Sequence, residues 1–104
     1  MISESEISKS IQDYLKSLNI KWFWRNQVYK GRVKSGAYLH TGISGISDLI
    51  FIAYGSTFYV EVKDATGKQT ADQKEFQQYC IDNQQTYIVA RSVDDLKAIL
   101  CEYN

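Results

Sequence analysis

Two carboxylates and a lysine lie in the most apolar part of the sequence. Asp48 is the only charge in the apolar segment 46–53, and Glu61 and Lys63 end the next apolar segment. If residues 54–55 form a two-residue turn, Asp48 faces Glu61 across an antiparallel hairpin, and Lys63 shares their face. Carboxylates opposed in this way have Cβ atoms about 5 Å apart and repel each other, so the pair favours a compensating cation.

The charges of this cluster indicate phosphodiester chemistry. Lys63 supplies one positive charge, whereas Mg²⁺ or Mn²⁺ would supply two and prefers oxygen ligands of this kind. A bound metal activates water and offsets the negative charge that develops on a phosphate, and a nearby ammonium group can orient the water or stabilise the transition state. By itself, an aspartate followed by Glu-x-Lys is also typical of a surface salt bridge, so the surrounding elements decide its meaning.

Hydrophobic spacing and capping residues predict the elements that would position this cluster. A first helix is expected over 3–18. A second helix is expected from Thr70, which forms a capping-box pattern with Gln73, to about Asn83, and a third helix follows Ser92. Strands are expected over 21–26, 46–53, 58–63 and 86–90. The order α-β-β-β-α-β-α predicts an α/β domain.

The formal net charge is zero, with 12 basic and 12 acidic residues, but the charges are unevenly distributed. Segment 21–47 holds five basic residues and no acid, so the rest of the chain carries a balance of −5. Four glycines fall in the same stretch, which predicts a flexible cationic loop over the phosphates of a nucleic acid. A solvated loop without a binding role would explain the same composition. The candidate DNA-binding residues are Arg25, Lys30, Arg32 and Lys34.

Two tryptophans lie on one face of the expected strand 21–26. Trp22 and Trp24 share this face, and Phe23 and Arg25 share the other. Aromatic rings in such a position can stack on bases. We expect core packing or a dimer interface instead, because a small domain needs its large apolar side chains inside.

Composition excludes several classes of protein. Hydrophobic residues make up 44% of the 104 residues, which is typical of a folded domain. No apolar run approaches the length of about 18 residues that a membrane span needs, and the polar N-terminus does not resemble a secretory signal. Cys80 and Cys101 lack Cys-x-x-Cys spacing and are expected to be buried thiols. We therefore expect an intracellular protein without a membrane partner.

Three segments together resemble the VRR-NUC family, a branch of the PD-(D/E)xK nucleases that is also similar to Holliday-junction resolvases. They are Gly45-Ile46-Ser47-Asp48-Leu49-Ile50, Tyr59-Val60-Glu61-Val62-Lys63 and Gly67-Lys68-Gln69-Thr70-Ala71-Asp72-Gln73. Ser47 departs from the family pattern, because a proline often precedes the aspartate. The resemblance implies a restriction-endonuclease-like core, with a mixed central sheet flanked by helices, and one nuclease domain over residues 1–104. It also implies DNA cleavage with Mg²⁺ or Mn²⁺.

The resemblance assigns roles to individual residues. Asp48 matches the metal-binding aspartate of the family, and Glu61 and Lys63 match its Glu-x-Lys pair. Gln73 matches a glutamine that helps to order the site. The capping box is an alternative role for Gln73, and we do not expect one side chain to serve both roles at once.

The family also uses a glutamate on its first helix. Glu4 lies three residues before Ile7 and seven before Ile11, so it shares the inward face of the expected helix. Glu4 is therefore the expected additional metal ligand, and Glu6, which points elsewhere, is the fallback. A favourable interaction with the helix dipole would explain both acids without a metal.

These features predict a metal-dependent endonuclease that hydrolyses DNA phosphodiester bonds. Cleavage of branched DNA, such as four-way junctions, is the favoured activity, and a symmetric cut of a junction by a chain with one site implies a homodimer. A nuclease of the same fold that acts on linear DNA or RNA, or a non-catalytic DNA-binding module, is the alternative. Small stand-alone members of the family occur in phages, which fits a protein in the cytoplasm of a bacterial or phage-infected cell.

Overall fold

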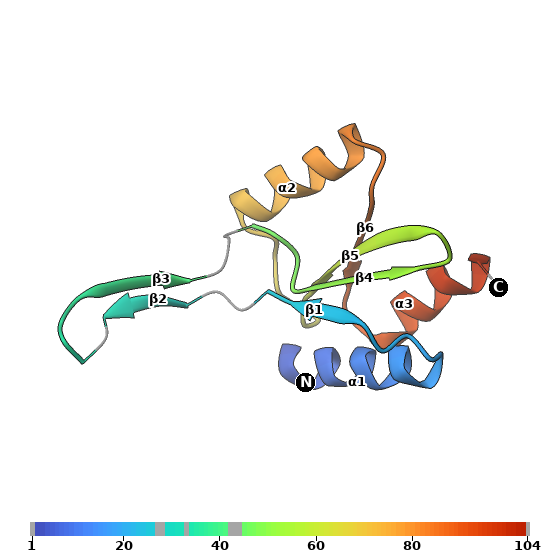
Figure 1. The fold of residues 1–104 in the computed structure, drawn as a ribbon, viewed down its shortest axis with the longest axis horizontal. Coiled ribbons are helices and arrows are strands. Elements are labelled where there is room, and N and C mark those ends of the chain that lie inside the picture. The colour runs from blue at the N-terminus through green and yellow to red at the C-terminus, as the bar shows by residue number, and fades with distance from the viewer. Residues whose placement is uncertain (1, 27–28, 33, 42–44, 104) are drawn as a thin grey trace.

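A four-stranded mixed sheet forms the centre of the molecule (Figure 1). The computed structural model describes residues 2–26, 29–32, 34–41 and 45–103. In sheet order, the strands are β1 (Phe23–Arg25), β4 (Leu49–Ala53), β5 (Ser56–Val62) and β6 (Thr86–Ala90). The pairs β1–β4 and β4–β5 are antiparallel, and β6 runs parallel to β5, so the predicted mixed sheet is confirmed.

Three helices cover the two faces of this sheet. α1 (Glu4–Ser17) and α3 (Val93–Leu100) pack on one face, and α2 (Ala71–Asp82) lies on the other face, over β5 and β6 (Figure 1). α2 and α3 begin at the predicted capping residues Thr70 and Ser92. The order of elements in the body is therefore the predicted one. None of the helices in the described ranges has the length and hydrophobicity that crossing a membrane requires.

Local turn chemistry determines the register of the β4–β5 hairpin. Residues 54–55 have φ angles of 53° and 76°, and positive values at both positions are what a type I′ turn requires. The strands then pair without a bulge as far as Leu49 and Val60. One further step along this ladder places Asp48 opposite Glu61, so the predicted hairpin register is confirmed.

The core lies between the sheet and the helices α1 and α3. Ile7, Ile11 and Leu15 recur on one side of α1 and are buried against the sheet. The rings of Phe51 and Phe58 stack across the hairpin with their centroids 4.9 Å apart. This packing holds the first helix over the strands that carry the predicted carboxylate cluster.

The basic, glycine-rich segment is not the flexible loop that the sequence predicts. β2 (Tyr29–Arg32) and β3 (Tyr38–Thr41) pair antiparallel and form a separate two-stranded sheet. This β2–β3 hairpin projects from the body along the longest dimension of the molecule, which is 50 Å (Figure 1). Its tyrosines and threonine favour strands, and the pairing satisfies the backbone groups of the segment. Residues 27–28, 33 and 42–44 of the predicted loop lie outside the described residues.

The two tryptophans lie outside the core, so the predicted core packing is wrong. Trp22 is 83% exposed and Trp24 is 56% exposed, whereas Phe23 between them packs against the core. β1 is at the edge of the sheet, and α2 lies over the far strands, β5 and β6. The tryptophan face of β1 is therefore left uncovered in the described part of the chain. The dimer interface stays a prediction.

The cysteines also differ from the expectation that both are buried. Cys80 is buried on α2, but Cys101 is exposed, and both are free thiols. Cys101 begins a short 3₁₀ helix, Cys101–Tyr103, directly after Leu100, which is the last buried residue of α3. The chain has left the core at this point, and Cys101 therefore faces solvent.

Candidate active site

Asp48, Glu61 and Lys63 come together at the end of the β4–β5 hairpin. Asp48 immediately precedes β4, Glu61 lies in β5, and Lys63 directly follows β5. Glu61 is 1% exposed and Lys63 is 7% exposed, whereas Asp48 is half-buried. The structure therefore assembles the three residues on which the predicted chemistry depends.

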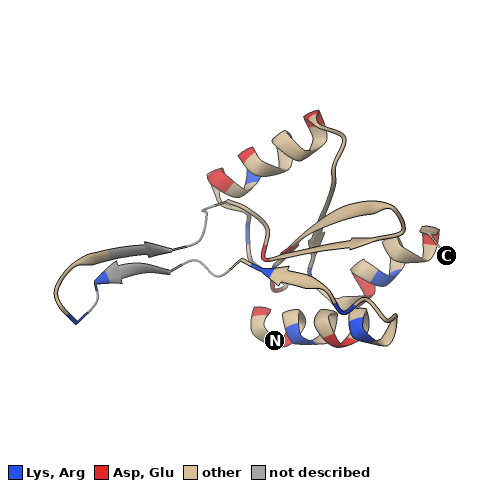
Figure 2. Cartoon of the chain, in the orientation of Figure 1, with Lys and Arg blue, Asp and Glu red and all other residues tan. Residues whose placement is uncertain are grey.

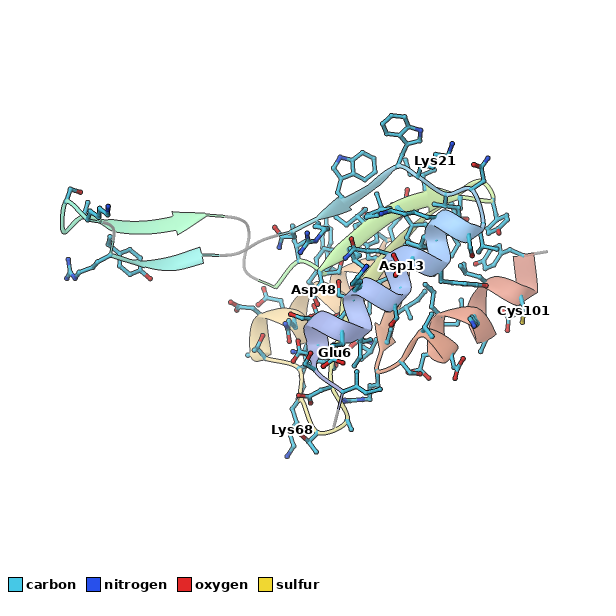
Figure 3. The ribbon with its side chains drawn as sticks, turned by 90° about the horizontal axis from the view of Figure 1, so that it is seen from below. Glu6, Asp13, Lys21, Asp48, Lys68 and Cys101 are labelled. Carbon is cyan, nitrogen blue, oxygen red and sulfur yellow. The ribbon has the colours of Figure 1, made fainter. Side chains whose placement is uncertain are left out.

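Two backbone contacts hold Asp48 between its neighbouring strands. Its Oδ2 accepts a hydrogen bond of 2.8 Å from the backbone N–H of Val62, at the point where the ladder with β5 ends. Its carbonyl oxygen accepts a hydrogen bond of 2.9 Å from the backbone N–H of Asn26, which follows β1. Asp48 lines a cavity together with Glu4 and Ser5 of the first turn of α1, and Figure 3 labels Asp48 at this end of the helix. A carboxylate held in this way is positioned before any ligand arrives.

Glu61 is a buried carboxylate with an incomplete set of partners. Its Oε2 accepts a hydrogen bond of 3.2 Å from Nε2 of Gln73, while its Oε1 is buried without a hydrogen-bond partner in the described part of the chain. Burial, and then the neighbouring carboxyl of Asp48, raises the pKa of Glu61 from 4.5 to about 9. Lys63 lowers this pKa, and Glu4 adds to the rise. A cation beside the two carboxylates would offset this unfavourable burial of charge.

Gln73 serves the helix cap and the carboxylate pair at the same time, so the expectation that it cannot do both is wrong. Its Oε1 accepts a hydrogen bond of 2.8 Å from the backbone N–H of Thr70, and its own N–H donates to Oγ1 of Thr70 at 3.2 Å. Its Nε2 donates to Glu61. A side-chain amide has its acceptor and its donors on different atoms, so the two contacts do not compete.

α1 contributes Glu4, rather than Glu6, to the neighbourhood of the pair. The Oε1 of Glu6 accepts hydrogen bonds from the backbone N–H (3.5 Å) and Oγ (3.1 Å) of Ser3 in a capping box. Glu4 lines the same cavity as Asp48. In the described ranges, no three His, Cys, Asp or Glu side chains lie close enough to hold a metal ion. The three predicted metal ligands are therefore not gathered into one closed group.

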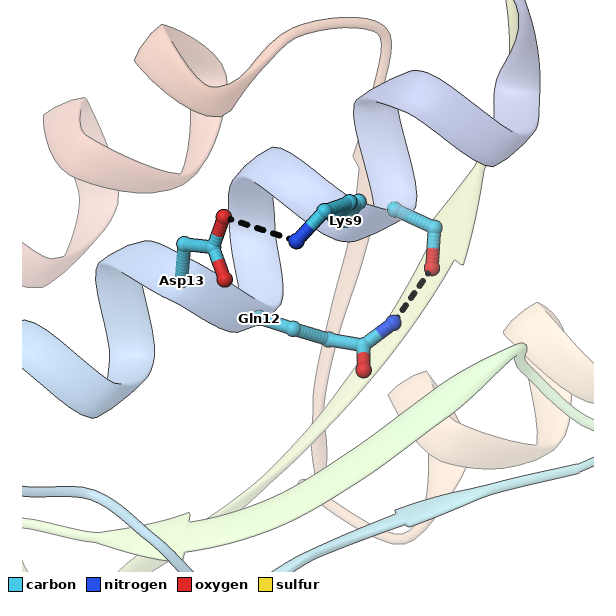
Figure 4. A network of polar contacts seen from close by, with 4 residues as sticks. Lys9, Gln12 and Asp13 are labelled. Carbon is cyan, nitrogen blue, oxygen red and sulfur yellow. Dashed lines mark hydrogen bonds and ion pairs between the residues drawn. The ribbon is translucent and has the colours of Figure 1, made fainter.

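An open cavity of about 470 Å³ lies beside the site, between α1 and the end of β1. Glu4, Arg25 and Asp48 are among the residues that line it. Figure 4 shows two contacts along α1 near this cavity, Lys9 with Asp13 (3.4 Å) and Gln12 with Ser8 (3.0 Å). Its walls are polar and charged of both signs, which suits a charged, hydrated ligand rather than an apolar one.

The predicted DNA-binding residues divide between this cavity and the β2–β3 hairpin. Arg25 ends β1 and lines the cavity, and Lys30 lies in β2. Arg32 ends β2, and its Nη1 donates a hydrogen bond of 2.8 Å to the carbonyl oxygen of Gly36 in the turn. Lys34 is exposed in the same turn, and Figure 2 shows basic residues at the tip of the projecting hairpin.

Two residues just before Asp48 support the site in ways that the sequence analysis missed. Gly45 has a φ of +88°, and a Cβ there would lie 2.6 Å from the carbonyl oxygen of Asp72, at the start of α2. Ser47 is fully buried, and its Oγ donates a hydrogen bond of 3.2 Å to the carbonyl oxygen of Leu49. A glycine three residues before the aspartate is the sequence signal that could have revealed the tight contact with α2.

Arg91 holds the loop that follows Lys63, and no sequence pattern singled it out. Its Nη1 donates hydrogen bonds to the carbonyl oxygens of Asp64 (2.6 Å) and Gly67 (2.8 Å). The Asp64 carboxylate accepts a hydrogen bond of 2.6 Å from the backbone N–H of Gly67. These contacts fold the loop back on itself and keep the Asp64 carboxylate engaged within it.

Comparison with known proteins identifies the fold of this chain. No protein-family model matches the chain, and no curated protein matches its sequence. A solved structure described as a VRR_NUC domain protein matches it with a TM-score of 0.72. The match covers 99% of this chain and 88% of the other, at 19% sequence identity. The chain therefore has the fold of a VRR_NUC domain, which confirms the predicted α/β core with a mixed sheet flanked by helices.

Proposed function

We propose that this chain, as one domain over residues 1–104, is a metal-dependent nuclease that hydrolyses DNA phosphodiester bonds, with branched DNA such as a four-way junction as the favoured substrate. The observation that supports this most strongly is the opposed pair of Asp48 and Glu61, with Lys63 beside them, in a VRR_NUC fold. A surface salt bridge does not explain this cluster, because Glu61 and Lys63 are both buried.

The carboxylate pair fits a divalent metal ion. Mg²⁺ is usually held by one or two carboxylates together with waters and substrate phosphates, so it does not need a closed group of three protein ligands. Asp48 and Glu61 would hold the ion, and the buried Oε1 of Glu61 is the oxygen that lacks a partner within the described residues. Glu4 would act from the cavity wall. When bound, Mg²⁺ or Mn²⁺ activates water and offsets the charge on the phosphate.

The side chains of the protein hold the reacting groups in place. Lys63 directly follows the strand that carries Glu61, and its ammonium group can stabilise negative charge on the phosphate under attack. The N–H of Val62 holds Asp48, and the amide of Gln73 holds Glu61. Because these contacts exist before substrate binds, little reorganisation is needed during the reaction.

Replacing Gln73 by alanine is expected to lower the rate of DNA cleavage by about 10-fold to 100-fold, because Glu61 loses the amide that orients it. The matched variant Thr70→Ala weakens the same helix cap by about 1 kcal/mol but leaves the amide of Gln73 in place. It should cleave at nearly the wild-type rate. Single-turnover experiments measure the cleavage rate, and urea denaturation measures the free energy of unfolding. Equal losses of rate in both variants would show that Gln73 acts only as a cap.

The β2–β3 hairpin extends the basic surface away from the cavity. Arg25 lies four residues before β2, and Asp48 lies seven residues after β3, so both ends of the hairpin connect to segments that line the cavity. DNA bound at the carboxylates would therefore pass the base of the hairpin. The formal net charge of zero predicts modest affinity for arbitrary duplex and recognition that depends on the shape of the DNA.

Replacing Lys34 by alanine is expected to weaken binding to all DNA sequences to a similar degree and to lower the slope of log K against log salt by about one. The reason is that an exposed lysine at the tip contacts phosphate and not bases. Fluorescence anisotropy at several salt concentrations in EDTA measures this slope. Lys16→Ala, at the far end of α1, is the control and should leave the slope unchanged. An unchanged slope for Lys34→Ala would remove the hairpin tip from the DNA interface.

A symmetric cut of a four-way junction is expected to require a homodimer, because each chain provides one carboxylate pair. Analytical ultracentrifugation at micromolar concentration, with and without junction DNA in EDTA, measures the oligomeric state. We expect a two-fold dimer at least in the presence of the junction. A monomer under both conditions would argue against junction resolution and leave flaps or linear DNA as the substrate.

A panel of substrates tests the proposed function directly. Four-way junction, flap, linear duplex and single-stranded DNA, together with RNA, are incubated with Mg²⁺ or Mn²⁺ and analysed on gels. We expect metal-dependent cleavage of DNA, strongest on the junction. Binding without cleavage on every substrate would indicate a non-catalytic DNA-binding module, and cleavage confined to RNA would overturn the choice of substrate.

A further inference from the structure

The uncovered side of the sheet edge carries two tryptophans, one directly before β1 and one within it, that the proposed nuclease chemistry does not use. Trp22 and Trp24 are both exposed, and Phe23 between them packs against the core. Ile52, on the neighbouring strand β4, is also exposed. Burying apolar area of this kind is favourable, so a surface with two neighbouring exposed tryptophans points to a ligand or a partner.

The charge beside Trp22 favours a polyanion over a second copy of the chain. Lys21 is exposed directly before Trp22, and Figure 3 shows it at the outer end of the strand. Arg25 follows Trp24 but shares the opposite face with Phe23, and it lines the cavity beside α1. A hollow of about 270 Å³ beside Trp22 is lined by Lys21 and Ile52, and no acidic residue is among the described residues that line it. A two-fold contact of this face would repeat Lys21 in both copies, and no acid lines the hollow to pair with it among the described residues.

We propose that Trp22 and Trp24 form a stacking platform for unpaired nucleotides of single-stranded DNA. Side chains two residues apart on a strand are about 6.6 Å apart, which resembles the spacing of bases in an extended single strand. Each indole can therefore stack on one base, while Lys21 contacts a phosphate. Any base can be accepted, because stacking does not read the edges of the bases.

The platform is continuous with the candidate active site. Trp24 pairs with Ile50 of β4, and Asp48 lies two residues before Ile50 on the same side of the ladder. A single strand that lies along β1 would therefore be directed towards the carboxylates. This step rests on the proposed function, and it gives a physical basis for a preference for branched DNA, whose unpaired nucleotides can occupy the platform while the adjoining phosphate reaches the site.

The chain offers a direct readout, because Trp22 and Trp24 are its only tryptophans. A twelve-residue thymidine oligonucleotide is titrated into the wild-type protein in EDTA, and we expect it to quench the tryptophan fluorescence. Anisotropy of the fluorescein-labelled oligonucleotide then gives Kd for the variants. Trp24→Ala should raise Kd about 5-fold to 100-fold, whereas Trp24→Phe should retain most of the affinity, because a phenyl ring still stacks. Tyr79→Ala, which removes an aromatic ring that is 65% exposed on α2, should leave Kd unchanged.

The outcomes separate the platform from the nuclease activity. If the oligonucleotide does not quench the fluorescence, and Trp24→Ala binds it as well as wild type, the platform is wrong even when DNA is cleaved. If quenching and the rise in Kd occur in a protein that cleaves nothing, the platform stands and the nuclease proposal fails. If fluorescence changes with protein concentration and not with DNA, and Trp24→Ala abolishes a dimer in ultracentrifugation, the face joins two copies and the platform is overturned.

Discussion

Lys63→Ala is expected to lower the rate of DNA cleavage by about 10²-fold to 10³-fold while the protein stays folded and still binds DNA. Removing one preorganised group that stabilises transition-state charge typically has an effect of this size. Lys63 is 7% exposed and shares the face of Asp48 and Glu61, so bulk solvent cannot easily replace its ammonium group. Single-turnover cleavage of a junction substrate with saturating Mn²⁺ measures the rate.

Two controls make the result for Lys63 specific. Lys16→Ala removes the same charge from the exposed last turn of α1 and should cleave at the wild-type rate. Lys63→Met retains most of the buried side-chain volume, so a loss of rate in this variant reports the missing charge rather than a cavity. If Lys63→Ala turns over like wild type, the active site has been assigned to the wrong residues.

Glu61→Gln is expected to have two opposite effects: cleavage falls by at least about 10²-fold, and the metal-free protein becomes more stable at neutral and alkaline pH. Cleavage falls because an amide is a poor ligand for Mg²⁺. Stability rises because the folded-state pKa of Glu61, about 9, lies above its ordinary value of 4.5. The stabilising contribution of the protonated carboxyl is complete below pH 4.5 and is lost as the pH rises through 9. Glutamine stays neutral at every pH.

Thermal unfolding in EDTA between pH 5 and pH 9 tests this prediction. The melting temperature of Glu61→Gln should exceed that of wild type by a margin that grows with pH and reaches roughly 4 °C or more at the alkaline end, as about 1 kcal/mol produces in a domain of this size. Mg²⁺ should narrow the margin, because it stabilises only the wild type. Glu75→Gln, on the exposed side of α2, should show no such pH dependence. A wild type that is the more stable protein at pH 8 in EDTA would contradict the burial of an unpaired carboxyl.

One physical cause explains why Glu61→Gln should raise stability and lower activity. Burial beside Asp48 makes the ionised form of Glu61 unfavourable in the metal-free protein. A bound cation would offset this unfavourable free energy. The metal-free wild type is therefore expected to unfold more easily than a variant with a neutral side chain at position 61. Strain of this sort is expected where the groups are arranged for binding rather than for stability.

The elements that depend on neighbouring residues were predictable from the sequence. The turn at residues 54–55 determines which residues of the hairpin face each other, so Asp48 and Glu61 could be paired before the structure was known. Thr70 and Ser92 satisfy the free N–H groups of the helices that they begin, and this also depends on local sequence alone. The fold class followed from the order of these elements.

Burial and side-chain direction, in contrast, depend on which elements pack together. Trp22 and Trp24 are exposed because α2 lies over β5 and β6 and leaves the edge strand uncovered, and nothing local to β1 signals this. The β2–β3 hairpin was also not predicted, because its short strands pair only with each other and leave no clear apolar alternation. Glycine and lysine in β2 weaken the strand signal further.

The sequence by itself therefore determined which residues the hairpin brings together, since the spacing of Asp48, Glu61 and Lys63 on a tight hairpin is a local property. The tertiary structure decided the surroundings of those groups. Packing of the domain buries Glu61 and thereby raises the pKa of its carboxyl. It also brings Gln73 of α2 within hydrogen-bond distance of that carboxyl and leaves the tryptophan face of β1 open. Each of these depends on contacts between elements that are far apart in the chain, and hydrophobic packing of the whole domain selects those contacts.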